Sequence, residues 1–554
     1  MRAAPVPVYC KAGPFDDFPF DDFSAGCGGM ATIEEAYTVA IDHHQAGRLD
    51  EAAIIYQRIL DADPEQAHAV HLLGIVAGQQ GRHGEAVALI GAAVARDGLN
   101  TDFLGNLGAA LKAAGRYDEA IRHFARALAL EPAARGVPGN LGSALAADGR
   151  IDEAVSWLRR AAALDPVHFE TLLNLGIALR DAGQFDEAET ALETAKSLRP
   201  DHPHPVCELA VLKLALGEFE EGLALYERRW DYTGQSAAVS GKPLWRGEDI
   251  AGKTILLYYE QGLGDTLQFV RYAPLLADRG ARVLLIVQPE LRRLLASVRG
   301  IDRLATYEDA AALPRFDLCC PLMSLPFAFG TRIDGIPSGE PYITPSPELA
   351  AGWAGRLGWN RSGEFAGKRP LRVGFVWSGN PRRHDPTSHA MDRRRSVPFA
   401  LIEPLLSVPG IEAVSLQVGN AAEQARAAIA AGLLTDPMAD VTDFADTAAI
   451  AAHLDLVITV DTSVAHLAAG TGRPVWMLSR ADACWRWFHG RSDSPWYPTM
   501  RLYRQDSPGD WGPVMARVAH DLAAVALGDR NCVENRLADV GAGSSFPGST
   551  EGAG

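Results

Sequence analysis

Cysteine is scarce in this sequence, and its spacing suits neither of its usual structural roles. The 554 residues include seven cysteines, which are scattered along the chain. An odd number argues against a framework of disulfides, and no two cysteines have the CxxC spacing of a structural zinc site. We therefore expect reduced thiols and a cytoplasmic protein.

Long apolar runs are also missing. No run approaches the ~20 apolar residues that are needed to cross a bilayer. The first 23 residues carry Pro, Asp and Phe where a signal peptide needs an unbroken apolar core. We expect no membrane span, a flexible leader over residues 1–32 and a disordered Gly/Ser-rich tail over residues 527–554.

The chain has no excess of positive charge. Its net charge is -17 and its pI is near 5.4. Such a balance repels a polyphosphate backbone, so the sequence predicts no nucleic-acid partner. The apolar fraction of 47% is that of an ordinary soluble protein, and the length calls for several domains.

A 34-residue period dominates the first half of the chain. A glycine recurs at this spacing, and a small residue follows five positions after each one. The glycines are Gly47, Gly81, Gly115, Gly149, Gly183 and Gly217, and the small residues are Ala52, Ala86, Ala120, Ala154, Ala188 and Gly222. The pattern resembles the tetratricopeptide repeat and predicts six two-helix units over residues 33–236.

A solenoid of this kind has a concave surface because each unit buries its apolar face only against its neighbours. The resemblance implies that a polypeptide binds in this groove. A surface for dimerisation, or a spacer, is the alternative. The sixth unit departs from the pattern, with Gly222 in place of Ala and no closing Pro, as expected of a terminal unit that docks on another domain.

After a polar linker over residues 237–252, the period changes to alternating strands and helices. We predict strands at 253–259, 281–288, 316–320, 371–379, 411–418, 456–460 and 475–478. Helices are predicted at 266–280, 289–300, 399–408 and 447–454, with a loop at 380–398. The alternation favours parallel sheets. The predicted fold class is thus α + α/β, with lobes over residues 253–368 and 369–526 after the solenoid.

Polar residues follow three of the predicted strands, where ligands of open α/β sheets bind. The first group is a glycine turn, Glu260 to Asp265, which lacks the Lys-Ser/Thr of a P-loop and the full GxGxxG of a dinucleotide site. Gly262 and Gly264 would let a ligand approach the backbone. Asp265 either serves the chemistry or caps the helix that follows.

The second group follows the strand that ends near Trp377. Ser378 and Asn380 lead into a basic loop with Arg382, Arg383, His384, Arg393, Arg394 and Arg395. In an acidic chain this concentration of positive charge favours an anionic ligand, because the guanidinium fork suits phosphate. A solvated run of charges is the alternative.

The third group lies within residues 456–478, which read as strand, tight turn and helix. Asp461, Thr462, Ser463 and His466 stand at the start of that helix. Free N–H groups at the positive end of a helix suit a phosphate. These residues otherwise only cap the helix.

The three groups together resemble heptosyltransferase-type glycosyltransferases of the two-lobed, nucleotide-sugar-dependent fold, in the bacterial branch where this domain follows tetratricopeptide repeats. The resemblance implies that Asp265 is the general base and that Asp461, Thr462, Ser463 and His466 hold the diphosphate and neighbouring sugar of the donor. Arg395 would neutralise the leaving phosphate. Ser463 stands where the family often has Gly, and an Arg where it typically has Lys, so the donor sugar stays open.

From these features we expect a glycosyltransferase that moves a sugar from a nucleotide sugar to a polypeptide such as a flagellin. We expect no cofactor and no metal, because no DxD-like motif follows a strand. A repeat scaffold with a degenerate nucleotide-binding domain is the alternative, and a nucleotide-sugar epimerase a third. The aromatic segment Cys484 to Tyr503 either stacks on a sugar or base, or packs the lobes.

Overall fold

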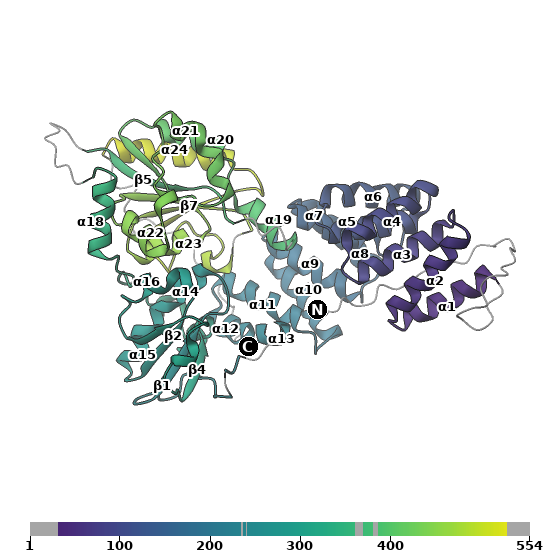
Figure 1. The fold of residues 1–554 in the computed structure, drawn as a ribbon, viewed down its shortest axis with the longest axis horizontal. Coiled ribbons are helices and arrows are strands. Elements are labelled where there is room, and N and C mark those ends of the chain that lie inside the picture. Colours follow the sequence, from purple (N-terminus) through teal and green to yellow (C-terminus); the bar gives the residue numbers. More distant parts are fainter. Residues whose placement is uncertain are drawn as a thin grey trace, which may run out of the picture. The chain divides into compact units, whose positions relative to one another are not determined.

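The fold is described from a computed structural model, which describes residues 32–233, 237–239, 241–359, 369–380, 386–482 and 484–528. The predicted leader and almost all of the predicted tail lie outside these residues. The chain forms two compact units, one of residues 1–198 with 382–391 and one of residues 199–381 with 392–554. Each unit is described separately (Figure 1).

The first unit is a series of paired helices. Each pair is one repeat, and its two helices pack against each other and against the next pair. The ten helices are α1 Ile33–Gln45, α2 Leu49–Ala62, α3 Ala67–Gln79, α4 His83–Arg96, α5 Thr101–Ala113, α6 Tyr117–Leu130, α7 Val137–Asp148, α8 Ile151–Leu164, α9 Phe169–Asp181 and α10 Phe185–Leu198.

Two sets of glycines explain the period. The turn glycine of each pair has a positive φ, such as 74° at Gly115, which a residue with a Cβ rarely adopts. The second set lies inside the first helix of a pair. A Cβ at Gly108 would lie 2.6 Å from Phe124, and one at Gly142 would lie 2.6 Å from Leu158. The small residues thus let the two helices of a repeat approach closely.

The sixth repeat belongs to the second compact unit. It consists of α11 Pro203–Leu216 and the short α12 Phe219–Tyr226, followed by α13 Arg229–Thr233. Leu214, Phe219 and Leu223 are buried in the same apolar core as residues of both α/β lobes. The terminal repeat is therefore fused to the lobes through shared packing.

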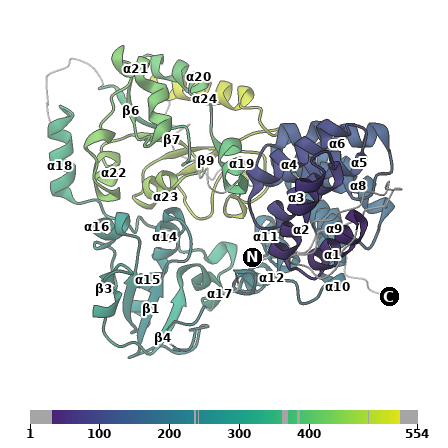
Figure 2. The ribbon, with the colours of Figure 1, turned by 45° about the vertical axis from the view of Figure 1, so that its right-hand side comes forward.

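The N-terminal lobe is built on a four-stranded parallel sheet of order β3-β2-β1-β4 (Figure 2). Its strands are β1 Thr254–Tyr258, β2 Arg282–Ile286, β3 Ile301–Ala305 and β4 Leu318–Pro321. Its helices are α14 Leu263–Phe269, α15 Ala273–Asp278, α16 Arg292–Leu295 and α17 Leu325–Ala328, whereas the next helix, α18 Pro347–Arg356, packs against α22 (Phe444–Ala451) of the C-terminal lobe.

The linker between the repeats and this lobe runs along the edge of the sheet. Trp245 N–H donates to Cys319 O over 2.9 Å, and Cys319 N–H donates to Pro243 O over 3.0 Å. Leu244 thus forms an isolated parallel bridge with Cys319 of β4. The Trp245 side chain is buried and its indole N–H donates to Glu248 O.

The C-terminal lobe carries a five-stranded parallel sheet of order β6-β5-β7-β8-β9. Its strands are β5 Leu371–Val376, β6 Ile411–Ser415, β7 Leu456–Val460, β8 Val475–Ser479 and β9 Met500–Arg504. Its helices are α19 Pro386–Arg395, α20 Phe399–Ile402, α21 Arg426–Ala430, α22 Phe444–Ala451, α23 Ser463–Gly470 and α24 Gly512–Ala526. The first part of α19, up to Met391, belongs to the first compact unit.

The two faces of this sheet are covered by different helices. Ile458 and Val460 of β7 share a core with α20 and α24, whereas Val457 shares the other core with α22 and α23. Both faces are buried, which is why four of the five residues of β7 are apolar and the fifth, Thr459, is buried as well. Among the described residues, no helix is both long and apolar enough to cross a membrane.

The structure differs from several of the predicted elements. The helix predicted over residues 289–300 is a 3₁₀ turn followed by α16, and the one predicted over residues 399–408 is α20 followed by a 3₁₀ helix. The helix expected over residues 266–280 breaks into α14, a 3₁₀ turn and α15, because Pro274 has no N–H to donate within a continuous helix. Residues 386–395 form α19 where a loop was expected, with Pro386 at its first position. Strands β3 and β9 were not predicted.

Candidate functional site

Gln417, just after β6, ties the predicted basic segment to the sheet. Its side-chain oxygen accepts from Trp377 N–H and Ser378 N–H over 3.0 and 2.9 Å, and its side-chain nitrogen donates to Ser378 O. The side chain is 2% exposed. The backbone that follows β5 is therefore held at the carboxyl edge of the sheet, where a ligand of an open α/β sheet binds.

Arg395, at the end of α19, reaches the end of β7. Its guanidinium pairs with the buried carboxylate of Asp392 at 2.7 Å, and its Nη1 donates to Asp461 O over 3.2 Å. A Cβ at Gly379 would collide with Arg395 Nη2, so only glycine leaves room for the guanidinium. The structure therefore brings together Arg395 and Asp461, which the sequence separates by 66 positions.

The start of α23 has no side-chain cap. Thr462 is the N-cap residue, but its side chain accepts no hydrogen bond from the helix, and its hydroxyl lies 3.2 Å from Thr459 Oγ1. Asp461, Thr462 and Ser463 are each partly exposed. The first N–H groups of this eight-residue helix thus remain available to an anion next to Arg395.

Ser378 and Asn380 differ in their surroundings. The Ser378 hydroxyl lies 3.1 Å from Ser396 Oγ, and Ser396 in turn donates to Asp392 O. Asn380 is exposed. Arg382, Arg383 and His384 lie outside the described residues. Arg394 forms an ion pair with Asp482 at 3.3 Å, so part of the basic segment is neutralised.

In the N-terminal lobe the glycine turn that follows β1 presents Asp265. Gly262 is the N-cap of α14, and its N–H donates to Asp265 Oδ2 over 2.9 Å. The other carboxylate oxygen, Oδ1, accepts from Arg486 Nη2 over 2.5 Å. Since a carboxylate has about four lone-pair sites, both oxygens can still accept a further hydrogen bond. The Asp265 side chain is 20% exposed, so solutes can reach it.

Arg486 comes from the C-terminal lobe, in a 3₁₀ turn at Trp485–Trp487. Burial lowers the pKa of this guanidinium, but Asp265 together with the nearby Cys484 and Tyr226 outweighs burial and leaves the pKa raised. The ring of Trp485 lies 4.6 Å from the guanidinium. The ion pair between Asp265 and Arg486 therefore joins the two lobes.

Helices α14 and α23 meet where Gly264 faces His466. A Cβ at Gly264 would lie 2.9 Å from His466 Cδ2. His466 is 5% exposed, and its Nδ1 lies 2.8 Å from Tyr497 Oη. Burial lowers the pKa of His466 to about 4, so the ring is neutral at pH 7. The structure thus places these two predicted donor-binding residues in a close helix contact.

The aromatic segment is packed into the protein. Its six large rings are at most 4% exposed: Trp485, Trp487, Phe488, Trp496, Tyr497 and Tyr503. Packing of the lobes, one of the two interpretations of this segment, accounts for these rings. Arg271 of the N-terminal lobe lies 4.5 Å from the Tyr497 ring and donates to Trp496 O.

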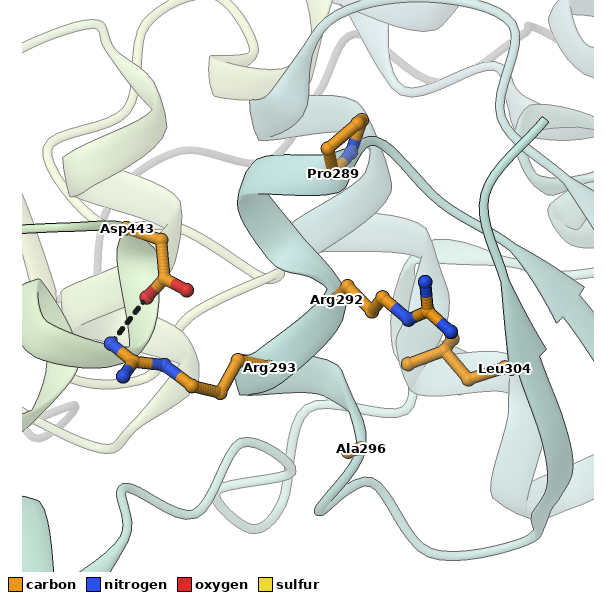
Figure 3. Close-up of a pocket in the computed structure, with 6 residues that line it drawn as sticks. All are labelled: Pro289, Arg292, Arg293, Ala296, Leu304 and Asp443. Carbon is orange, nitrogen blue, oxygen red and sulfur yellow. Dashed lines mark hydrogen bonds and ion pairs between the residues drawn. The ribbon is translucent and has the colours of Figure 1, made fainter. Parts of the chain in front are cut away.

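A pocket of about 490 Å³ lies elsewhere in the second unit (Figure 3). It is lined by Pro289, Arg292, Arg293, Ala296, Leu304 and Asp443, none of which belongs to the three groups of polar residues that follow the predicted strands. Both of its arginines are paired, Arg292 with Asp309 and Arg293 with Asp443 and Asp446. Among the described residues, no three His, Cys, Asp or Glu side chains are grouped to hold a metal ion.

Sequence reasoning missed Gln417, Arg486 and the contacts of the sixth repeat with the glycine turn. Gln417 lies two positions after β6 and inside the strand predicted over residues 411–418, where a polar side chain between Leu416 and Val418 is a signal that could have been used. Arg486 carries no comparable signal, because it lies 221 positions from Asp265 and among tryptophans.

Comparison with known families finds matches in both halves of the chain. Models of the tetratricopeptide repeat match residues 71–135, 111–175, 145–205 and 179–241. The model of glycosyltransferase family 9 (heptosyltransferase) matches residues 406–479, which include Asp461 to His466. Residues 71–241 are thus similar to tetratricopeptide repeats, and residues 406–479 are similar to glycosyltransferase family 9.

Similar proteins include Protein FlbA of Caulobacter vibrioides, which is 28% identical over 297 residues. That match covers 50% of this chain and 47% of FlbA, so the chain spans about half the length of this relative. Among solved structures, YrrB, described as a TPR protein with an unusual peptide-binding site, covers 31% of this chain and 88% of its own, at 24% identity and a TM-score of 0.27. The match to PilF of Pseudomonas aeruginosa covers 37% of this chain and 93% of PilF, at 18% identity and a TM-score of 0.33.

Proposed function

We propose that this protein is a glycosyltransferase that moves a sugar from a nucleotide-sugar donor to a polypeptide recruited by the repeats. The observation that carries the proposal is the arrangement at the carboxyl edge of the C-terminal sheet. There Arg395 contacts Asp461 O beside the uncapped start of α23, within a lobe whose residues 406–479 match family 9.

The charges at this edge suit a diphosphate. When the bond between the sugar and the donor breaks, negative charge develops on the departing phosphate. Arg395 would stabilise that charge together with the N–H groups of Ser463 and Val464 and the dipole of α23. In this proposal no metal is required, because these groups carry the positive charge.

Asp265 is the proposed general base. The acceptor hydroxyl oxygen forms a bond to the anomeric carbon, while the bond from that carbon to the phosphate oxygen breaks. Asp265 takes the hydroxyl proton, and the nucleoside diphosphate leaves. Its partial exposure and its free lone pairs support this role, and Arg486 keeps a positive charge beside the carboxylate. His466, being neutral, would act in binding and packing rather than as a cation.

Binding of a donor tests the proposal first. Screening a panel of nucleotide sugars should identify one that raises the unfolding temperature, since a ligand that binds only the native state stabilises it. Arg395→Ala should weaken that donor's affinity about 10-fold, the effect of losing a charged hydrogen bond. Asp265→Asn should still bind the donor, yet its rate of transfer to protein should fall at least 100-fold, the low end for loss of general base catalysis.

Arg426→Ala and Asp278→Asn are matched controls in the same two lobes, at largely exposed ion pairs. Both should keep the affinity and rate of the native protein. Full transfer by Asp265→Asn would exclude it as the base. If no nucleotide sugar binds, the repeat scaffold with a degenerate domain is the correct alternative.

A further inference from the structure

Arg229 of the sixth repeat is buried with every one of its donors satisfied. Its Nε and Nη2 donate to the two carboxylate oxygens of Glu260, each over 2.8 Å. Nη1 donates to Tyr226 O and Glu227, and Nη2 also donates to Ser324 Oγ. All five N–H groups of the guanidinium are thus used. The side chains of Arg229 and Glu260 are 9% and 8% exposed.

Glu260 is the first residue of the glycine turn that presents Asp265. The next residue, Gln261, donates to Tyr226 Oη over 3.3 Å, so a second side chain of the sixth repeat reaches the turn. Gly262 then donates its N–H to Asp265. Arg229 therefore holds one end of the turn through its hydrogen bonds to Glu260, and Asp265 lies five residues further along the same turn.

The same repeat also holds the segment that carries Arg486. Phe219 of α12 stacks on Phe488, with ring centres 5.7 Å apart and planes inclined by 15°. His489 N–H donates to Ala215 O of α11 over 3.0 Å. Phe488 has a φ of 52°, in the region that favours glycine, so surrounding contacts must maintain this conformation. Both partners of the ion pair between Asp265 and Arg486 are thus supported by α11 to α13.

We propose that the sixth repeat is a positioning element of the transferase site, and that Arg229 is a positioning residue for the turn that carries Asp265. This inference rests on the proposed function. The terminal repeat then does more than extend the groove for a polypeptide: it sets the place of the general base relative to Arg486 in the other lobe.

The chemistry of the pair favours positioning over stability alone. A buried ion pair adds little net stability over apolar residues of similar volume, because both charges lose their hydration. The planar fork does fix direction, since it binds both oxygens of Glu260 at once. Lysine has three donors around one nitrogen and cannot reproduce five bonds in a plane.

Arg229→Lys in the full-length protein tests the proposal. We expect kcat for transfer to fall at least 10-fold, while KM for the nucleotide sugar stays within 2-fold, because the donor edge of the C-terminal lobe is not touched. Hydrogen exchange of the amides of residues 260–265 should accelerate at least 10-fold, while the amides of β5 and β7 exchange as before. Arg228→Lys, at an exposed ion pair on the neighbouring position, should change none of these quantities.

Native kcat and native exchange of residues 260–265 in Arg229→Lys would overturn the proposal. So would acceleration spread evenly over the whole unit, because that result marks a purely structural role. If Arg229→Lys does not fold, Glu260→Gln takes its place with the same readouts and outcomes. If the native protein transfers no sugar at all, the proposed function fails. The hydrogen exchange of Arg229→Lys still decides whether Arg229 positions the turn: acceleration confined to residues 260–265 supports this role, and acceleration over the whole unit contradicts it.

Discussion

His466 shows how burial sets the charge of a single residue at the helix contact. Its pKa of about 4 lies below the value of 6.5 for a free histidine. Between these two pH values the unfolded chain therefore binds a proton that the folded protein does not. The free energy of unfolding therefore has its full contribution from this histidine above pH 6.5. As the pH falls from 6.5 to 4, the free energy of unfolding decreases by about 3 kcal/mol at most.

Removing this group should flatten the acid limb of the stability curve. His466→Asn should lose less unfolding free energy than the native protein between pH 6.5 and 4, as measured by denaturant unfolding at several pH values. His520→Asn, at an exposed histidine, is the control and should follow the native curve. Parallel curves for His466→Asn and the native protein would show that this ring does not remain neutral in the folded state.

Single residues were predictable where their chemistry is local. Asp461 directly follows a strand, Asp265 ends the glycine turn after another strand, and Arg395 lies in a run of like charges, so the pattern of the neighbouring residues identifies them as candidates. Arg486 is different, because its importance comes from a contact with Asp265 made only after folding. Arg229 likewise looks like an ordinary charge near the end of a repeat. Such pairs need tertiary structure.

At the scale of elements, glycine controls the distance between the helices of a repeat. Gly108→Ala would place a Cβ 2.6 Å from Phe124, and we expect a loss of about 1–3 kcal/mol from overpacking. Gly91 lies inside α4, and a Cβ added there would meet nothing within 4 Å. Gly91→Ala should therefore gain up to about 1 kcal/mol from helix propensity.

Denaturant unfolding of both variants checks this contrast. The essential result is that the change in unfolding free energy has opposite signs in the two variants, because the chemical change from Gly to Ala is the same. An unchanged stability for Gly108→Ala would mean that α5 and α6 can separate without cost, and that the period does not report a close contact.

Elements with strong periodic patterns were predictable, and those without were not. The repeats follow from a 34-residue period, and β7 from a run of five buried residues, four of them apolar. Strand β3 was missed because Asp302 and Arg303 in its middle are exposed and polar. Strand β9 was missed because it lies at the end of a segment dominated by aromatic residues. Because β3 lies at the edge of its sheet and buries little surface, its sequence carries a weak signal.

For the whole molecule, the repeat period and the compact units divide the chain differently. The period runs through all six repeats to residue 236, whereas the compact units divide between Leu198 and Arg199. The reason is physical: the sixth repeat buries Leu214, Phe219 and Leu223 in the core of the lobes. Repetition in sequence therefore does not mark the limit of cooperative packing.

Native-state hydrogen exchange should reveal this division. Amides of α11 and α12 should exchange with the same opening free energy as those of β1 and β7, because they share one core. Amides of α9 and α10 should exchange with a different opening free energy. A common opening free energy for α9 to α12, distinct from that of the lobes, would show instead that the sixth repeat unfolds with the solenoid.

The linker along β4 has a consequence for the behaviour of the protein at high concentration. An unpaired edge strand offers its backbone groups to other chains and so promotes aggregation. Pro243 to Trp245 occupy these groups on β4. At the opposite edge, exposed charges on β3 discourage the same pairing. The segment that joins the repeats to the α/β lobes thus also protects the sheet from forming intermolecular β-structure.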